Sequence, residues 1–227
     1  KKNLLTQRLS TKVNQIPQRY KMEFKLLKPF GPSVVKTQIP EKMVNDLNEY
    51  IDQIINDKKK LDLLNYGNKL AGDVSQEFKL EADFAKKVGW TDFLAKTVYA
   101  WIDKELNKKI TKFNTIQTWI VRQFENEYNP VHWHSGHISG AGYLKTPKNF
   151  GTFIQNKEKN YQGGSLSLIH GSKQFLSSSV LEIKPKVGDF YFFPHYMMHT
   201  VYPFKETNEE RRSISFNAVI DEEIFNQ

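Results

Sequence analysis

Apolar and polar positions follow two different periods along the chain, and the change falls near Thr111. In the first half, apolar residues recur every three or four positions, which places them on one face of a helix. The clearest case follows Pro40, a residue that suits the start of a helix, and predicts a helix over residues 41–56. Its apolar face comprises Val44, Leu47, Ile51 and Ile54.

A second helix is predicted from Thr91 to about Lys109, with Thr91 as the N-cap because its hydroxyl can accept a backbone N–H. The residues expected to face the core again follow a helical period, and they are Leu94, Val98, Trp101, Ile102 and Leu106. We expect both helices to pack against one face of a β-sandwich that the rest of the chain forms.

Beyond Thr111 the chain consists of short runs rich in Ile, Val, Phe, Tyr and Thr. Runs of this kind, bounded by Gly, Pro, Asn and Asp, are typical of β-strands separated by turns. The turn signals are Asn129-Pro130, Pro147, Gly163-Gly164, Gly171-Ser172, Gly188-Asp189 and Pro203. Many short strands at regular spacing predict a mainly β fold with flanking helices, in the form of a sandwich or jelly roll.

The length of 227 residues suits a single domain, and no internal repeat or low-complexity linker divides it. Residues 1–20 are polar, lack a steady period and are expected to form a loosely held N-terminal arm. Alternation over residues 21–27 predicts one early strand. We therefore interpret residues 21–112 as helical and strand support for a β core at residues 113–220.

The composition narrows the chemistry that the chain can perform. The absence of cysteine excludes a disulfide scaffold, a thiolate metal site and a cysteine nucleophile, so any metal must be held by histidine and oxygen ligands. No apolar run reaches the length of a membrane span and no signal peptide is expected, so we expect a cytoplasmic protein with no membrane partner. The net charge of +8 suits an acidic macromolecule as partner, although many lysines alternate with acidic residues as on a solvated helix face.

A pair of histidines stands in the segment NPVHWH at residues 129–134. In extended backbone, residues two apart point to the same side, so His132 and His134 can reach one ion while Trp133 points away and packs elsewhere. A third ligand must then come from a distant strand, and His199 lies at the start of an apparent one. Neutral imidazole is a good ligand for Fe(II). A histidine pair alone is also common on surfaces and in cores.

Four pieces of sequence between Ile116 and Asn217, taken together, point to a metal site more specifically than the histidine pair alone. They are the His-x-His of residues 132–134, the strand ending in Tyr-Leu-Lys at residues 143–145, the Gly-Asp-Phe-x-Phe-Phe-Pro run at residues 188–194 that leads to His199, and the Arg-x-Ser of residues 211–213. Their order and spacing resemble the 2-oxoglutarate/Fe(II)-dependent oxygenase superfamily, particularly its prolyl-hydroxylase-like branch. The resemblance implies a double-stranded β-helix, an Fe(II) site, and oxidation of C–H bonds coupled to decarboxylation of 2-oxoglutarate.

The resemblance also assigns roles to individual residues. His132 matches the proximal metal ligand and His199 the distal one. Arg211, with Ser213, matches the group that grips the distal carboxylate of 2-oxoglutarate, which suits a guanidinium because it can bind a carboxylate with two parallel hydrogen bonds. Tyr143 matches a tyrosine that assists at the same carboxylate, and its alternative is a tyrosine of the core.

Alternation along the last strand separates polar from apolar positions. One face carries Arg211, Ser213, Ser215 and Asn217, and the other carries Arg212, Ile214 and Phe216. We expect the polar face to line a ligand pocket, and Arg212 to point away from it and serve as an internal control. The alternative is an edge strand with a solvated polar face. Gln117 and Trp119 share a face of an earlier strand and line either the pocket or the core.

His134 departs from the family pattern, in which Asp or Glu holds this position. A third neutral ligand leaves the metal site one unit more positive, which affects dioxygen chemistry and metal preference. We favour a site with three histidines. In the alternatives, His137 displaces His134, or the chain is a catalytically altered relative. A halogenase is not expected, because in this family that chemistry needs a small residue at the carboxylate position.

The sequence therefore predicts an Fe(II)- and 2-oxoglutarate-dependent oxygenase that uses dioxygen, forms succinate and CO2, and hydroxylates an unidentified substrate. A protein side chain or a small molecule is favoured as substrate, and the basic charge leaves an acidic macromolecule open. Two rival hypotheses remain. One is a three-histidine cupin-like metalloenzyme that does not use 2-oxoglutarate, and the other is a non-enzymatic jelly-roll module that binds a polyanion.

Overall fold

The computed structural model describes residues 23–27 and 31–227 of the chain. The predicted arm at residues 1–20 lies outside the described residues. The strand predicted over residues 21–27 is present, within the described part, as β1 (Phe24–Leu27). None of the described helices is both long enough and apolar enough to span a membrane.

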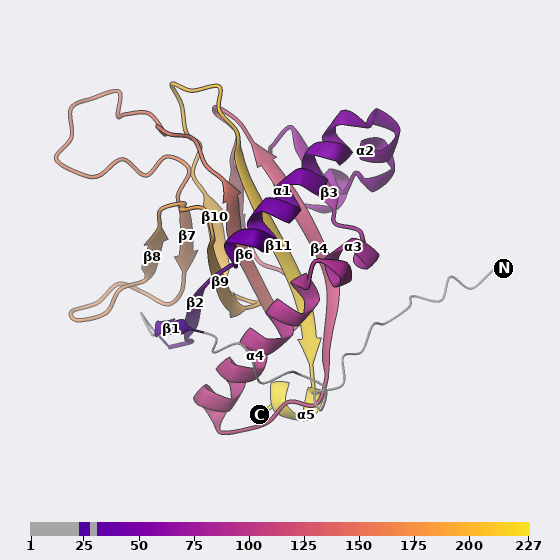
Figure 1. Ribbon diagram of the computed structural model, residues 1–227. Helices are drawn as coiled ribbons and strands as arrows, with labels where there is room; N and C mark the ends of the chain where they lie inside the picture. Colours follow the sequence, from indigo (N-terminus) through magenta and orange to yellow (C-terminus); the bar gives the residue numbers. More distant parts are fainter. Residues whose placement is uncertain (1–22, 28–30) are drawn as a thin grey trace.

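Two antiparallel sheets form the centre of the molecule (Figure 1). The larger sheet has seven strands, which pair in the order β1, β2 (Val34–Gln38), β9 (Asp189–Pro194), β6 (Ile138–Lys145), β11 (Arg211–Ile220), β4 (Phe113–Gln123) and β3 (Gln76–Lys79). The smaller sheet has four strands, in the order β5 (Asn129–His132), β10 (Met198–Val201), β7 (Leu166–Ile169) and β8 (Val180–Ile183). The predicted mainly β jelly roll is confirmed.

Helices cover the outer face of the larger sheet, as predicted. Figure 1 shows α1 (Glu41–Asn56) and α4 (Trp90–Leu106) running across that face. The shorter helices are α2 (Lys58–Leu64), α3 (Ala82–Lys87) and α5 (Glu222–Phe225). All four residues predicted for the apolar face of α1 are buried. They join one hydrophobic cluster with α4 and with sheet residues such as Phe190, Phe192 and Phe216.

The predicted boundaries of α4 are wrong at both ends. Gly89 is the N-cap, with a left-handed φ of 81°, so Thr91 lies inside the first turn. Glycine adopts this conformation without steric cost, which lets the chain turn sharply after α3. The helix ends at Leu106 because Asn107 is also left-handed, and Leu106 is 45% exposed instead of facing the core. The other four residues predicted for that face are buried.

Two strands of the first half escape prediction, and one predicted turn is a strand. β2 pairs with β9 and β3 pairs with β4, so the first half of the chain extends the larger sheet on both sides. Both strands are short, and cross-strand pairing rather than a strong local pattern holds them extended. The Asn129-Pro130 signal was interpreted as a turn, but it begins β5. Proline is tolerated there because β5 is an edge strand, where a missing N–H leaves no neighbour unpaired.

Candidate metal and co-substrate site

His132 and His199 lie directly opposite each other on paired strands of the smaller sheet. His132 ends β5, and His199 is the second residue of β10. Opposed residues of an antiparallel pair share a face, and the two ring centroids are 4.2 Å apart. The prediction that these two histidines stand on neighbouring strands and meet inside the barrel is therefore confirmed.

The backbone fixes which nitrogen each of these rings presents. His132 Nδ1 lies 2.7 Å from the Pro130 carbonyl oxygen, and His199 Nδ1 lies 2.8 Å from that of Met197. A carbonyl oxygen only accepts, so both Nδ1 atoms must carry the proton and donate. Each Nε2 is thereby left with a free lone pair, the arrangement in which a second partner orients a metal-binding histidine.

His134 reaches the same point from a loop. The strand ends at His132, and two hydrogen bonds to His195 hold the loop: His134 N–H donates to the His195 carbonyl at 3.0 Å, and His195 Nδ1 donates to the His134 carbonyl at 2.9 Å. His134 Nε2 lies 3.1 Å from His199 Nε2. Two nitrogens bound at right angles to one ion, at about 2.1 Å each, would be about 3.0 Å apart.

The cluster contains His134 and does not contain His137. Ligand atoms of His132, His134 and His199 all lie within 4.8 Å of one another. His137 instead accepts the backbone N–H of Ile220 at 3.0 Å, and its ring stacks on Phe225 at 3.8 Å. Among the described residues, no carboxylate joins the three imidazoles. The geometry therefore favours the three-histidine set over the alternative with His137.

Burial keeps the three imidazoles neutral. It lowers the pKa of His199 to about 3, with a further contribution from His132. Burial and the neighbouring histidines lower the pKa of His134 to about 2, and burial also lowers the pKa of His132. Only neutral imidazole has a lone pair to give to a metal, so the site is ready to bind an ion at neutral pH.

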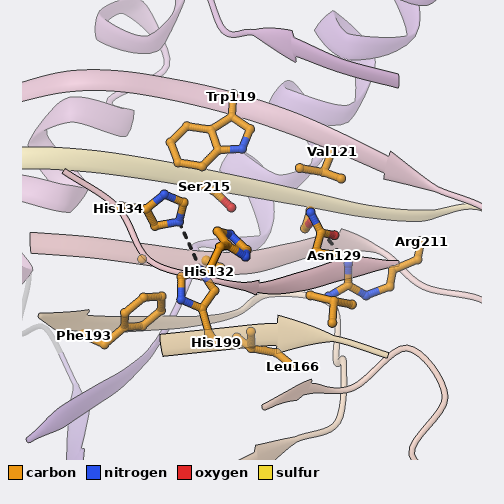
Figure 2. A pocket seen from close by; sticks show the side chains of 14 residues that line it. Trp119, Val121, Asn129, His132, His134, Leu166, Phe193, His199, Arg211 and Ser215 are labelled. Carbon is orange, nitrogen blue, oxygen red and sulfur yellow. Dashed lines mark hydrogen bonds between the residues drawn. The ribbon is translucent and has the colours of Figure 1, made fainter. Parts of the chain in front are cut away.

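A cavity between the two sheets connects the histidines with Arg211. Figure 2 shows the three imidazoles gathered toward one end and Arg211 at the other. The remaining lining residues are Trp119, Val121, Asn129, Gly140, Ala141, Leu166, Phe193, Val201, Ser213 and Ser215. Trp119 thus lines the cavity, and its ring meets that of His134 edge-on at 5.4 Å, whereas Gln117 is not part of the lining. Trp133 is not part of the lining, but it is 65% exposed rather than packed.

Arg211 is buried, at 2% exposure, and its hydrogen bonds are incomplete. Nη1 donates to Gln123 Oε1 at 3.2 Å and to Ser213 Oγ at 3.4 Å, while Nε has no partner. The guanidinium carbon lies 5.0 Å from the centre of the Tyr143 ring. Burial raises the pKa of Tyr143 to about 12 despite this cation, and the Tyr143 hydroxyl also lacks a well-oriented hydrogen-bond partner. The buried guanidinium and the phenol beside it therefore each keep a polar atom, Nε and the hydroxyl, without a well-oriented partner among the described residues.

Arg212 points to the opposite face of β11, as predicted, but it is not the neutral control that we expected. It is also 2% exposed and bonds to Glu210 and Asp52 at 2.7–3.0 Å and to the Asn48 side chain at 3.0 Å. β11 lies between β6 and β4 in the sheet, which excludes the alternative of an edge strand with a solvated face. Arg212 therefore links β11 to α1, and a change there affects the fold.

The donor set fits both a metal ion and a dicarboxylate. Three neutral nitrogens suit Fe(II). At the other end, the buried guanidinium of Arg211 has a free N–H that a carboxylate would satisfy, and leaving it unpaired carries a cost. The neighbouring phenol of Tyr143, which is not part of the cavity lining, has no other well-oriented partner among the described residues. A chelating acid that carries a second carboxylate matches this arrangement.

Residues 117–217 match the model of a protein family described as "Putative 2OG-Fe(II) oxygenase". Over these residues, the chain matches the 2-oxoglutarate/Fe(II)-dependent oxygenase superfamily. All four sequence pieces that carry the resemblance lie within the matched residues. No curated protein sequence matches this oxygenase significantly.

Solved structures show the same fold. The prolyl-4-hydroxylase from Pseudomonas putida is 15% identical, with a TM-score of 0.53, over 81% of this chain and 91% of that one. The viral collagen prolyl hydroxylase vCPH from Paramecium Bursaria Chlorella virus-1, in its 2OG complex, is 16% identical, with a TM-score of 0.51, over 82% and 94%. HygX from Streptomyces hygroscopicus, with nickel, 2-oxoglutarate and hygromycin B bound, is 10% identical, with a TM-score of 0.53, over 82% of both chains. The chain therefore has the fold of the prolyl-hydroxylase-like branch.

Sequence reasoning missed two residues of the site. Gln123 is fully buried and bonds to Arg211, and Asn129 is 8% exposed and lines the cavity. A signal for Gln123 was present, because it stands two and four residues after Val121 and Trp119 and so shares their face of β4. Asn129 was not considered as a site residue because the Asn129-Pro130 pair was interpreted as a turn.

Proposed function

We propose that this oxygenase binds Fe(II) through His132, His134 and His199, and that it hydroxylates a substrate with 2-oxoglutarate and dioxygen as co-substrates. The observation that supports this most strongly is the pairing of three neutral imidazoles with an incompletely bonded, buried arginine in one cavity. The three rings would hold the metal, and Arg211 would bind the far carboxylate of 2-oxoglutarate.

Bound iron and 2-oxoglutarate would supply the oxidative chemistry, in which 2-oxoglutarate is decarboxylated to succinate and CO2 while a C–H bond is hydroxylated. The chain itself contributes orientation and exclusion of water. Ser213 and Tyr143 stand beside Arg211, where their hydroxyls can donate to the same carboxylate. Trp119 and Phe193 pack against the rings of His134 and His199 and keep that end of the cavity apolar.

The missing carboxylate ligand changes the charge of the proposed centre. Three neutral imidazoles leave the charge of a divalent ion undiminished, whereas the usual triad of two histidines and one carboxylate lowers it by one unit. His134→Asp restores that triad at a position the loop already brings to the cluster. We expect this variant to keep or improve turnover of 2-oxoglutarate, and His134→Ala to weaken metal binding.

Anaerobic addition of Fe(II) and then 2-oxoglutarate to the metal-stripped protein tests the proposal. We expect one ion per chain, a visible charge-transfer band once 2-oxoglutarate chelates the metal, and succinate after admission of oxygen. His137→Ala is the control for His134→Ala, because His137 lies outside the cluster, and it should bind iron like the wild type.

Other results would favour the rival hypotheses. A bound ion without the band and without succinate would support a three-histidine enzyme that does not use 2-oxoglutarate. The absence of stoichiometric metal, together with polyanion binding that weakens steeply with salt, would support a binding module. The structural neighbours include prolyl hydroxylases and an enzyme complex with hygromycin B. We propose a protein side chain or a small molecule as the substrate.

A further inference from the structure

We infer that Gln123 is a positioning residue whose neutral side chain holds Arg211 without neutralising it, and thereby keeps this oxygenase selective for a 2-oxo acid with a second carboxylate. The inference rests on the proposed function. It concerns a residue that contacts the co-substrate only through Arg211.

Gln123 and Arg211 are opposite each other in the pairing of β4 with β11, so their side chains lie on the same face of the sheet. The Gln123 carbonyl oxygen accepts from Arg211 Nη1 at 3.2 Å. Its amide nitrogen donates to the backbone carbonyl oxygens of Glu127 and Tyr202. Because both ends of the amide are used and the residue is fully buried, its oxygen is held toward the guanidinium.

The chemistry of this contact differs from that of the neighbouring arginine. Arg212 is matched by the carboxylates of Glu210 and Asp52. Arg211 forms no ion pair with any residue in the described part of the chain. It donates to a glutamine and a serine, and the neutral side chain of Tyr143 lies beside it. An amide oxygen fixes the position of a guanidinium but leaves its full charge available. A carboxylate at the same place would fix the position and cancel the charge.

This difference between an amide and a carboxylate predicts how Gln123→Glu changes the binding of 2-oxo acids. The new carboxylate would pair with Arg211 and compete with the far carboxylate of 2-oxoglutarate, whose charged hydrogen bonds provide much of its binding. A 2-oxo acid without that second carboxylate gains nothing from Arg211, so its binding should not change. The variant is therefore expected to lose selectivity between the two acids, without loss of the metal.

The experiment measures dissociation constants of 2-oxoglutarate and of 2-oxopentanoate, which has the same chain length but one carboxylate. Calorimetry on the Mn(II)-loaded 227-residue chain without oxygen gives these constants independently of turnover. For Gln123→Glu we expect the 2-oxoglutarate constant to rise on the order of tenfold to a hundredfold, with the 2-oxopentanoate constant and Mn(II) affinity unchanged. Gln123→Met, which removes the hydrogen bonds but adds no charge, should raise the 2-oxoglutarate constant only a few-fold.

Gln117→Glu is the matched control, because it makes the same chemical change on the same strand outside the cavity lining. It should leave both constants as in the wild type. An unchanged ratio of the two constants in Gln123→Glu, or an equal change in Gln117→Glu, would overturn the inference. If Gln123→Glu does not fold, an unchanged ratio in Gln123→Met overturns it as well. A wild-type protein that binds Mn(II) but neither acid would overturn the proposed function itself.

Discussion

The larger sheet separates two interiors that are built on different principles. On its outer face, helices α1 and α4 close an almost wholly apolar cluster around Trp90, Phe190 and Phe216. On its inner face, toward the smaller sheet, apolar side chains are interrupted by histidines, serines and an arginine that line a cavity. In the first interior the buried arginine is paired, and the Trp90 indole N–H is a neutral donor without a partner among the described residues. In the second, the groups without a well-oriented partner among the described residues include a charged one, Arg211 Nε.

Two adjacent arginines of β11 differ in the same way in their hydrogen-bond and ion-pair partners. Arg212, in the helix-covered interior, is matched by Glu210, Asp52 and Asn48. Arg211, one residue earlier, is equally buried but keeps an unpaired Nε. Burial of a charge is costly unless it is paired, so a paired arginine indicates structure and an incompletely paired one indicates a ligand. Burial alone does not distinguish the two.

The largest effect is expected on the cavity side. His199→Ala should abolish stoichiometric Fe(II) or Mn(II) binding, because it removes a preoriented Nε2 from the centre of the cluster. Its free energy of unfolding without metal should stay near that of the wild type, since the helix-covered interior is untouched. Metal analysis after dialysis and denaturant unfolding test both statements. Full binding by the double variant His132→Ala/His199→Ala would show that the metal site lies elsewhere.

Arg212→Ala should instead lower stability and leave ligand binding unchanged. It leaves Glu210 buried without one of its cations, and breaking a buried pair in this way lowers the free energy of unfolding by about 3 kcal/mol or more. The affinity of the folded protein for 2-oxoglutarate should not change. Urea unfolding and calorimetry measure the two quantities. A stable variant with weakened 2-oxoglutarate binding would contradict the division of roles between the two interiors.

Arg211→Ala is expected to affect binding and to spare the fold. The apparent constant for 2-oxoglutarate should rise about a hundredfold through loss of charged hydrogen bonds worth roughly 3 kcal/mol. Metal affinity should remain nearly unchanged. Without 2-oxoglutarate the variant should be as stable as the wild type, because no ion pair is lost. Unchanged succinate formation would favour the rival enzyme that does not use 2-oxoglutarate.

The smallest predicted effect, per unit of pH, concerns two buried glutamates with opposite pH dependence. Burial would raise the pKa of Glu210, but Arg212 and Arg122 outweigh it and lower the pKa to about 2. Its contribution to stability is present above its usual pKa and is lost as the pH falls from about 4.5 toward 2.

Glu77, on the inner face of β3 beside Asn129, has its pKa raised to about 7 by burial, which the Asn129 bond opposes. The folded state then keeps a proton that the unfolded chain has lost, so stability falls as the pH rises from about 4.5 to 7. Each slope is at most about 1.4 kcal/mol per pH unit. Denaturant unfolding at a series of pH values measures the free energy of unfolding, and Glu77→Gln and Glu210→Gln should each lose the corresponding dependence on pH. A variant whose stability varies with pH as that of the wild type does would contradict the assignment.

Alternation on regular strands was the part of the site that the sequence could predict. It correctly separated Arg211 from Arg212, because β11 is extended and paired on both sides. The same reasoning reached His134 by an incorrect route. β5 ends at His132, and His134 arrives through a loop that His195 holds, a contact between residues about sixty positions apart. Each arginine has one partner two residues away, Ser213 for Arg211 and Glu210 for Arg212. The others, Gln123, Asn48 and Asp52, come from distant segments that no local pattern reveals.

For the fold, long amphipathic patterns were predictable and short pairing strands were not. The stripe of α1 is strong because four turns repeat it. β2 and β3 have four or five residues each, and their extended conformation depends on β9 and β4. The ends of α4 were set by left-handed residues at Gly89 and Asn107, whose effect depends on the path of the chain beyond them.

The placement of β2 and β3 bears on how this oxygenase can be divided. A fragment that starts at Phe113 would keep all three histidines and Arg211, yet β9 and β4 would each lose a hydrogen-bonded neighbour. The apolar face beneath α1 and α4 would also be open to water. Bare sheet edges beside an uncovered apolar surface pair readily with other chains. The half that carries the proposed site is therefore not a portable module, and a shortened or fused version should retain the helices and both flanking strands.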